Sequence, residues 1–162
     1  MSQLIKLRFG ETIAAPPARV HARMLALEDY ERWTAAFCEG STYEGSWEPG
    51  ATIRFLSPTG DGMVSEIVEN RPGAFVSIRH RGVIDRGVED TSSEAIRTWA
   101  GALENYTFEP IAGGTRLTVE LDTLSEYAEM MREAWPKALA LLKQLCEEDS
   151  SPPWSAPARC PA

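Results

Sequence analysis

Apolar and polar residues alternate along most of the chain, and this period of two is typical of β-strands with one buried face. In the first segment, residues 4–13, Ile5, Leu7 and Phe9 fall on one face and basic residues fall on the other. Further strands are predicted at residues 43–47, 52–57, 63–70, 75–81, 99–109 and 115–122. Because Pro- and Gly-containing turns separate most of them, we expect an antiparallel sheet of about seven strands.

Two short helices are expected between the first strand and the rest of the sheet. Pro16 and Pro17 end the strand and favour a helix start, because proline is tolerated in the first helical turn. The apolar positions at helical spacing in this helix are Val20, Met24 and Leu27. Asp29 is predicted to cap a second helix, since its carboxylate can accept a hydrogen bond from a free backbone N–H group. The large apolar side chains that follow Asp29 are Tyr30, Trp33 and Phe37.

The last regular segment, residues 126–147, has the clearest pattern in the chain. On a helical wheel its apolar residues form one continuous arc of about half the circumference. The arc contains Tyr127, Met130, Met131, Ala134, Trp135, Ala138, Leu139, Leu141, Leu142, Leu145 and Cys146. Ser125 is the predicted N-cap, and Pro136 predicts a kink. An arc this wide suits a helix inside a concave surface, so we predict an α+β helix-grip fold, with a curved antiparallel sheet around the C-terminal helix.

All of these elements are expected to form one domain over residues 1–148, a length that allows a sizeable buried core. Within it, residues 83–98 read as a polar connection with one helical turn around residues 93–97. From residue 149 to residue 162 the sequence is rich in Pro and Ser. Such a composition predicts a flexible tail without regular structure.

Charge and composition narrow the classes of partner. The 24 acidic and 16 basic residues give a net charge of −8, which repels nucleic acid and anionic membranes. No apolar stretch reaches the roughly 20 residues that a membrane-spanning helix needs. The first residues lack a secretory hydrophobic region, and the three cysteines have no paired spacing. We therefore expect a soluble cytoplasmic protein that binds no nucleic acid and inserts into no membrane.

The order of elements resembles the START-related, Bet v 1-like superfamily (SRPBCC), and most closely its bacterial homologues of the heat-shock-protein-90 ATPase activator. The segments that carry the resemblance are residues 13–20 with Trp33, residues 99–101 with 104–109, residues 113–117, and residues 135–139 with Leu142 and Lys143. The resemblance covers about residues 3–148 and implies the helix-grip fold with a hydrophobic ligand cavity. It implies no particular reaction, because the superfamily includes lipid carriers, cyclases and co-chaperones.

The expected cavity is mainly apolar, with a few polar groups that orient the ligand. Its predicted ligand-binding residues are Trp33, Phe37, Phe55, Trp99, Tyr106, Met131, Trp135 and Leu142. Each of these side chains has an alternative role as ordinary core.

The sequence contains no convincing catalytic centre. Phosphate loops, metal-ligand spacings and a serine nucleophile motif are all absent, so no metal or cofactor is expected. The weak catalytic candidates are His80, Glu104 and Tyr106. If residues 75–81 pair antiparallel with 99–109, His80 and Glu104 take adjacent inward positions, where they can orient a ligand or move a proton. The alternative places His80 at a solvated mouth and pairs Glu104 with a neighbouring hydroxyl or Arg.

Three functions are compatible with these features of the sequence. A binding protein for a small hydrophobic molecule is favoured over the other two. The second is a cyclase- or dehydratase-type enzyme that uses acid–base groups of the cavity. The third is a protein-interaction module related to chaperone ATPase regulators, which would need an exposed apolar patch. The identity of any protein partner is left open.

Overall fold

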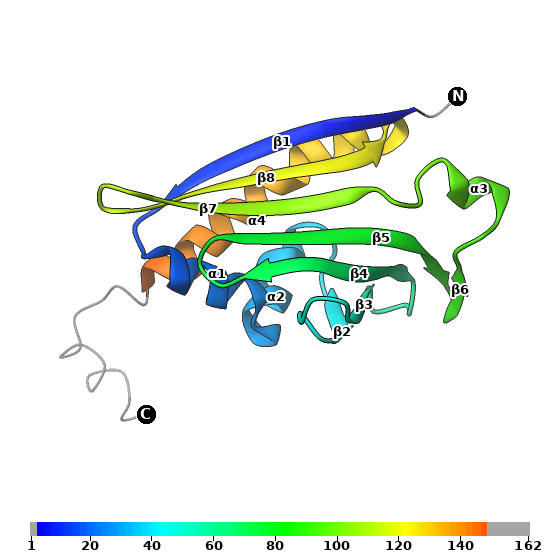
Figure 1. Ribbon diagram of the computed structural model, residues 1–162, viewed down its shortest axis with the longest axis horizontal. Helices are drawn as coiled ribbons and strands as arrows, with labels where there is room; N and C mark the ends of the chain where they lie inside the picture. Colours follow the sequence, from blue (N-terminus) through cyan, green and yellow to red (C-terminus); the bar gives the residue numbers. More distant parts are fainter. Residues whose placement is uncertain (1–2, 149–162) are drawn as a thin grey trace.

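The computed structural model describes residues 3–148, and its main feature is an eight-stranded antiparallel sheet (Figure 1). The strands are β1 (Leu4–Ile13), β2 (Thr42–Gly45), β3 (Thr52–Leu56), β4 (Gly62–Arg71), β5 (Phe75–Asp85), β6 (Val88–Asp90), β7 (Leu103–Ile111) and β8 (Gly114–Leu124). Their order across the sheet is β1-β8-β7-β5-β4-β3-β2, and β6 pairs with β5. The first strand, β1, therefore pairs with the last strand, β8, so the two strands furthest apart in the sequence are neighbours in the sheet. The predicted tail lies outside the described residues.

The helices are α1 (Pro17–Leu25), α2 (Leu27–Trp33), η1 (Thr34–Ala36), α3 (Glu94–Arg97), η2 (Ser125–Tyr127) and α4 (Ala128–Glu148). In Figure 1 α4 lies behind the sheet, and it contacts β1, α1, α2 and η1. The side chains of Trp135, Ala138, Leu139 and Leu142 on α4 are fully or almost fully buried. The structure confirms the predicted helix-grip fold, in which a curved antiparallel sheet wraps around a long C-terminal helix. No helix within residues 3–148 is long and apolar enough to cross a membrane.

The two predicted helix caps are wrong. The backbone at Ala26 is extended and occupies the N-cap position of α2, so Asp29 falls inside the first helical turn. There the Asp29 carboxylate accepts a hydrogen bond from Arg23, with 2.7 Å between Nη1 and Oδ1. Ser125 begins the 3-10 turn η2, and its hydroxyl oxygen accepts from the backbone N–H of Gln3 at 3.0 Å. The side chains of Asp29 and Ser125 therefore make tertiary hydrogen bonds, which cannot be predicted from the local sequence pattern of a helix.

The buried faces of the helices are narrower than their apolar patterns predict. Leu27 is 45% exposed because α1 ends before it and α2 begins at it. At the edges of the α4 pattern, Tyr127, Met130 and Leu141 are 48%, 46% and 36% exposed. Helix α4 continues through Pro136 from Ala128 to Glu148, and the kink expected at Pro136 stays a prediction.

The segment at residues 83–98 is not the polar connection that the sequence predicts. Strand β5 continues to Asp85, and a turn at Arg86 and Gly87, both with positive φ, leads directly into β6. Helix α3 is the helical turn expected there. At the other end of the connection, Trp99 belongs to a turn, and β7 begins only at Leu103. The β5–β6 hairpin therefore extends the sheet beyond residue 81, where the sequence predicted that the strand ends.

The predicted pairing of β5 with β7 is confirmed. Ile78 lies opposite Glu104 in the register. Beyond this pair, the His80 backbone N–H donates to the Ala102 carbonyl at 2.9 Å, and the Gly101 N–H donates to the His80 carbonyl at 2.8 Å. Alternation then places the His80 and Glu104 side chains next to each other on the inner face of the sheet.

Candidate ligand-binding cavity

A cavity of about 320 Å³ lies between the first half of α4, the α2–η1 segment and strands β3, β4 and β7. We call it the aromatic cavity, because six of its lining residues carry aromatic rings. Its lining residues are Tyr30, Trp33, Thr34, Phe37, Ser41, Phe55, Leu56, Ser57, Asp61, Gly62, Met63, Glu104, Tyr106, Met130, Met131 and Trp135. The position follows from the fold: the helix covers the concave face of the sheet, and its side chains leave this space unfilled.

Trp135 of α4 is the centre of the aromatic wall. Its ring contacts Phe37 at 5.0 Å between centroids, Trp33 at 5.9 Å and Tyr106 at 6.3 Å. The indole N–H of Trp33 donates to the Met24 carbonyl at 3.0 Å, so its polar atom is satisfied away from the cavity. These contacts fix the rings and leave apolar surface facing the open space.

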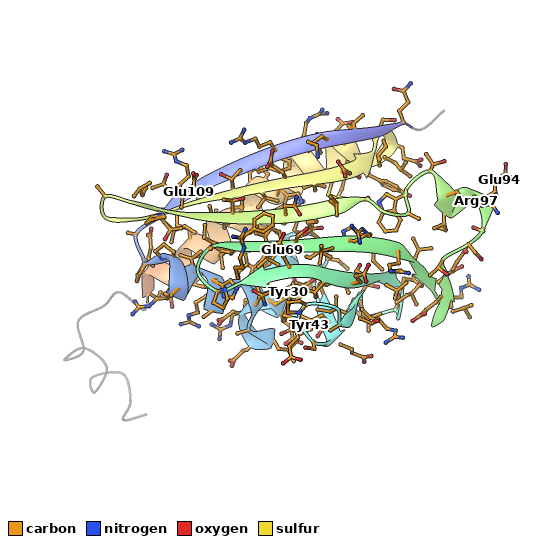
Figure 2. All side chains as sticks on the ribbon, in the orientation of Figure 1. Tyr30, Tyr43, Glu69, Glu94, Arg97 and Glu109 are labelled. Atoms are coloured by element: carbon orange, nitrogen blue, oxygen red, sulfur yellow. The ribbon has the colours of Figure 1, made fainter. Side chains whose placement is uncertain are left out.

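Tyr30 joins this wall to the sheet. Its ring meets those of Tyr43, Trp33 and Phe55 with centroids 5.0, 5.4 and 6.0 Å apart, and Figure 2 labels Tyr30 and Tyr43 side by side. The Tyr43 hydroxyl donates to the Leu25 carbonyl at 2.6 Å, which anchors the pair to α1. Burial, with a smaller effect from the negative charge of Glu104, raises the pKa of the Tyr30 hydroxyl far above its ordinary value. Tyr30 is therefore a neutral phenol at physiological pH.

Glu104 and Tyr106 of β7 bring a carboxylate and a hydroxyl to the lining of the aromatic cavity. These residues are two positions apart on one strand, so their side chains point to the same face. The Tyr106 hydroxyl donates a short hydrogen bond to Oε2 of Glu104. Burial raises the pKa of Tyr106 well above its ordinary value, and the Glu104 charge and hydrogen bond add to this effect. Tyr106 thus acts as a hydrogen-bond donor to a carboxylate that faces apolar space.

His80 contacts Glu104 but does not itself line the aromatic cavity. Its Nε2 lies 3.1 Å from Oε1 of Glu104, and its Nδ1 lies 2.7 Å from Oγ of Ser65. A register shift after Val64 puts Ser65 directly opposite His80, and both residues are buried. With the serine hydroxyl donating to Nδ1, the Nε2–H group is free to donate to Glu104. His80 therefore holds one oxygen of the carboxylate while Tyr106 holds the other.

Two features of this cluster bear on the alternatives left by the sequence. His80 is only 4% exposed, so its predicted alternative position at a solvated mouth is wrong. Its ring is enclosed by Trp99, stacked at 5.2 Å between centroids, and by the edge of Phe55 at 6.3 Å. The same alternative also paired Glu104 with a neighbouring hydroxyl, and the structure has such a hydroxyl, that of Tyr106.

The charged groups of the cavity lining are acidic. Besides Glu104, they include Asp61 in the β3–β4 turn. Asp61 accepts hydrogen bonds from the Arg86 backbone N–H at 2.8 Å and from the Thr59 hydroxyl at 3.0 Å. These bonds lower the pKa of Asp61 below its ordinary value. Among the described residues no Lys or Arg lines the cavity, so its electrostatic potential favours positive charge.

Most of the predicted ligand-binding residues line the cavity, but two do not. Trp33, Phe37, Phe55, Tyr106, Met131 and Trp135 do. Leu142 is fully buried in the core, two helical turns beyond the cavity residue Trp135. Trp99 covers His80 instead, because it lies in the turn before β7 and not in the strand. Whether the lining residues contact a ligand stays a prediction.

Several lining residues were not predicted. The spacing of Tyr30, Thr34 and Phe37 was a usable signal, since residues at i, i+4 and i+7 share one helix face. The residues of the β3–β4 turn gave no such signal, because their approach to α4 depends on how the sheet curls. Directly after that turn, Gly62 at the start of β4 packs so closely that an added Cβ would overlap the Phe55 carbonyl oxygen. Within residues 3–148, no group of three potential metal-ligating side chains is present.

Comparisons with known proteins agree with this architecture. The family model described as polyketide cyclase / dehydrase and lipid transport matches residues 5–147. A comparison with curated proteins finds no match. Among solved structures, protein MLL2253 from Mesorhizobium loti has 14% sequence identity and a TM-score of 0.69, with 89% of this chain and 98% of that chain covered.

Two other solved structures have the same overall arrangement. Protein CV1439 from Chromobacterium violaceum has 19% identity and a TM-score of 0.64, over 88% of this chain and 96% of that chain. Ara h 8.0201 has 12% identity and a TM-score of 0.62, over 90% of this chain and 99% of that chain. At these identities the likeness establishes the fold and says nothing of the ligand.

Proposed function

The chain belongs to the polyketide cyclase / dehydrase and lipid transport family, within the START-related, Bet v 1-like superfamily, and we propose that it binds a small hydrophobic molecule in the aromatic cavity. The observation that carries the proposal is the apolar space of about 320 Å³ beside α4. Its volume falls in the range of ligand pockets, roughly 300–1,000 Å³. Its lining also has the usual composition of such pockets, with aromatic walls and few polar groups.

The proposal is tested with N-phenyl-1-naphthylamine, a neutral probe whose fluorescence rises in apolar surroundings. Phe37 and Phe9 form a matched pair, because both rings contact Trp135, at 5.0 and 6.1 Å, but only Phe37 lines the cavity. We expect Phe37→Ala to weaken probe binding about fivefold or more, and Phe9→Ala to change it less than about twofold. Equal effects of the two substitutions, or no probe binding to the wild-type protein, would contradict the proposal.

A second function, acid–base catalysis in the cavity, is favoured by the His80–Glu104–Tyr106 cluster. A carboxylate supported by two hydrogen bonds and facing apolar space is suited to remove a proton next to a ketone carbonyl. In that step the proton moves from the α-carbon to Glu104, and the C–H electron pair forms an enolate. Solvent then delivers a proton to the carbon, and Glu104 releases the proton that it accepted to solvent. With 2-acetylnaphthalene in deuterated water, this function predicts faster methyl deuteration by the wild-type protein than by Glu104→Gln.

The narrower assignments remain predictions from the sequence. They are membership of the heat-shock-protein-90 ATPase activator homologues, a single domain over residues 1–148 with a flexible tail, and a cytoplasmic location. Membership of that group implies no activity by itself; the third function, an interaction module related to chaperone ATPase regulators, predicts that the protein stimulates ATP hydrolysis by purified heat-shock protein 90. An unchanged rate of ATP hydrolysis by heat-shock protein 90, at a saturating concentration of this protein, would contradict that function.

A further inference from the structure

The electrostatic sign of the aromatic cavity restricts the ligand beyond its hydrophobicity. Glu104 and Asp61 are the charged residues of the lining within the described chain, and both are acidic. The Glu104 side chain is 15% exposed, so little water is available to screen its charge. An anionic ligand, such as a carboxylate, would place a second negative charge in the same poorly solvated space. Repulsion of this kind selects against anions.

Glu104 also has hydrogen-bonding capacity beyond its two side-chain partners. An ionised carboxylate has about four acceptor positions on its two oxygens. His80 supplies one hydrogen bond to Oε1, and Tyr106 supplies one to Oε2. A ligand that brings N–H donors can occupy positions that remain. A ligand with only hydrocarbon surface would leave them without a partner in an apolar space, which is unfavourable.

The rings around this carboxylate add a second attraction for positive charge. Tyr106 donates to Glu104 and contacts Trp135, which in turn contacts Trp33 and Phe37. The faces of such rings carry partial negative charge and attract organic cations. A carboxylate next to a series of aromatic rings thus offers both an ion pair and cation–π contacts to one group.

We infer that the aromatic cavity selects a hydrophobic amine, with its protonated amino group at Glu104 and its apolar part among the aromatic rings. The inference rests on the proposed binding function and assigns its ligand class. Glu104 is the residue that discriminates, since it carries the buried negative charge. Tyr106 and His80 are positioning residues that hold its two oxygens in place.

The test compares three ligands that share a naphthyl group: 2-(1-naphthyl)ethylamine, 2-(1-naphthyl)ethanol and the carboxylate 1-naphthaleneacetate. Binding is measured by titration calorimetry at pH 7 and low salt. We expect the amine to bind at least about tenfold more tightly than the carboxylate, with the alcohol between them. In Glu104→Gln the amine and the alcohol should bind within about threefold of each other, because the charge is lost and the side-chain shape is kept.

Glu133→Gln supplies the matched control. It makes the same carboxylate-to-amide change at a side chain that is 73% exposed and lies outside the cavity lining. The preference for the amine should survive in Glu133→Gln. If the preference for the amine over the alcohol fell equally in Glu104→Gln and Glu133→Gln, the net charge of the protein would govern binding, and the inference would be overturned.

The wild-type comparison decides the question even if Glu104→Gln fails to fold. Binding of the carboxylate as tightly as the amine, or of the alcohol as tightly as the amine, overturns the inference and leaves the proposed function intact. Absence of binding by all three ligands and by N-phenyl-1-naphthylamine would instead contradict the proposed function itself.

Discussion

The indole ring of Trp99 stacks on the imidazole of His80, with 5.2 Å between centroids and 11° between planes. The contact covers a polar side chain that supports Glu104 from within the sheet. It also removes Trp99 from the cavity wall, where the sequence placed it. Trp99 therefore supports the His80–Glu104 pair but does not line the aromatic cavity.

Substitution of Trp99 should therefore affect stability more than binding. We expect Trp99→Leu to lower the free energy of unfolding by about 1–3 kcal/mol, from lost burial and lost ring stacking. Affinity for N-phenyl-1-naphthylamine should stay within about twofold of the wild-type value. Urea unfolding and probe titration measure the two effects. A tenfold loss of probe affinity with unchanged stability would place Trp99 in the binding wall.

The Arg23–Asp29 pair allows a test of how α2 is held. If Asp29 were a helix cap, Asn would replace it with little loss, because Asn is an equally good N-cap residue. In the structure Asp29 is 6% exposed, and its carboxylate accepts from Arg23 at 2.7 Å. We therefore expect Asp29→Asn to lower stability by about 1 kcal/mol in urea unfolding. The loss should shrink in an Arg23→Gln background, and an unchanged loss would argue against the pair.

The caps and the cavity show where sequence reasoning reached its limit. Alternation predicted β1 to the residue, and it placed His80 and Glu104 on the inner faces of two strands whose expected antiparallel pairing brings them together. Asp29 and Ser125 carry cap-forming side chains, but tertiary partners use them instead. Local propensity contains no information about such partners.

The same limit applies to the cavity lining. Residues of α2 and α4 were predictable because helical periodicity identifies the face that points inward. Asp61 and Gly62 could not be predicted, since they line the cavity only through the way in which the β3–β4 turn folds toward the helix. The β6 strand was missed for a similar reason: a three-residue strand, Val88–Asp90, has too short an alternation to recognise.

Two neighbouring leucines of α4 test the placement of the core. Leu142 is fully buried and lies outside the cavity lining, whereas Leu141 is 36% exposed. We expect Leu142→Ala to cost about 2–5 kcal/mol of stability, because it leaves an unfilled space in the core. Leu141→Ala should cost less than about 1 kcal/mol. Similar losses for the two variants, measured by chemical unfolding, would show that α4 is rotated from its position in the structure.

Stability should fall at alkaline pH because two phenols are buried. The pKa values of Tyr30 and Tyr106 are raised in the folded state, while unfolded tyrosine ionises near pH 10. Below about pH 10 both states are protonated, and above it the unfolded state releases protons first. Each phenol then reduces stability by up to about 1.4 kcal/mol per pH unit.

Urea unfolding at pH 8, 10 and 11 in wild type and Tyr106→Phe checks this effect. Because the variant also loses a hydrogen bond, the comparison uses the change in stability with pH and not its absolute value. The variant should lose less stability between pH 10 and pH 11 than the wild-type protein. Equal losses would show that Tyr106 ionises in the folded state as it does in water.

The methionine methyl groups offer the most direct test of binding in the aromatic cavity. Met63 and Met131 line it, whereas Met24 is fully buried in the core outside it. With methyl-labelled methionine, NMR measures nuclear Overhauser effects between these methyl groups and bound N-phenyl-1-naphthylamine. We expect such effects at Met63 and Met131 and none at Met24. Effects at Met24, or no effects at Met63 and Met131 while the probe is bound, would contradict a ligand held between α4 and the sheet.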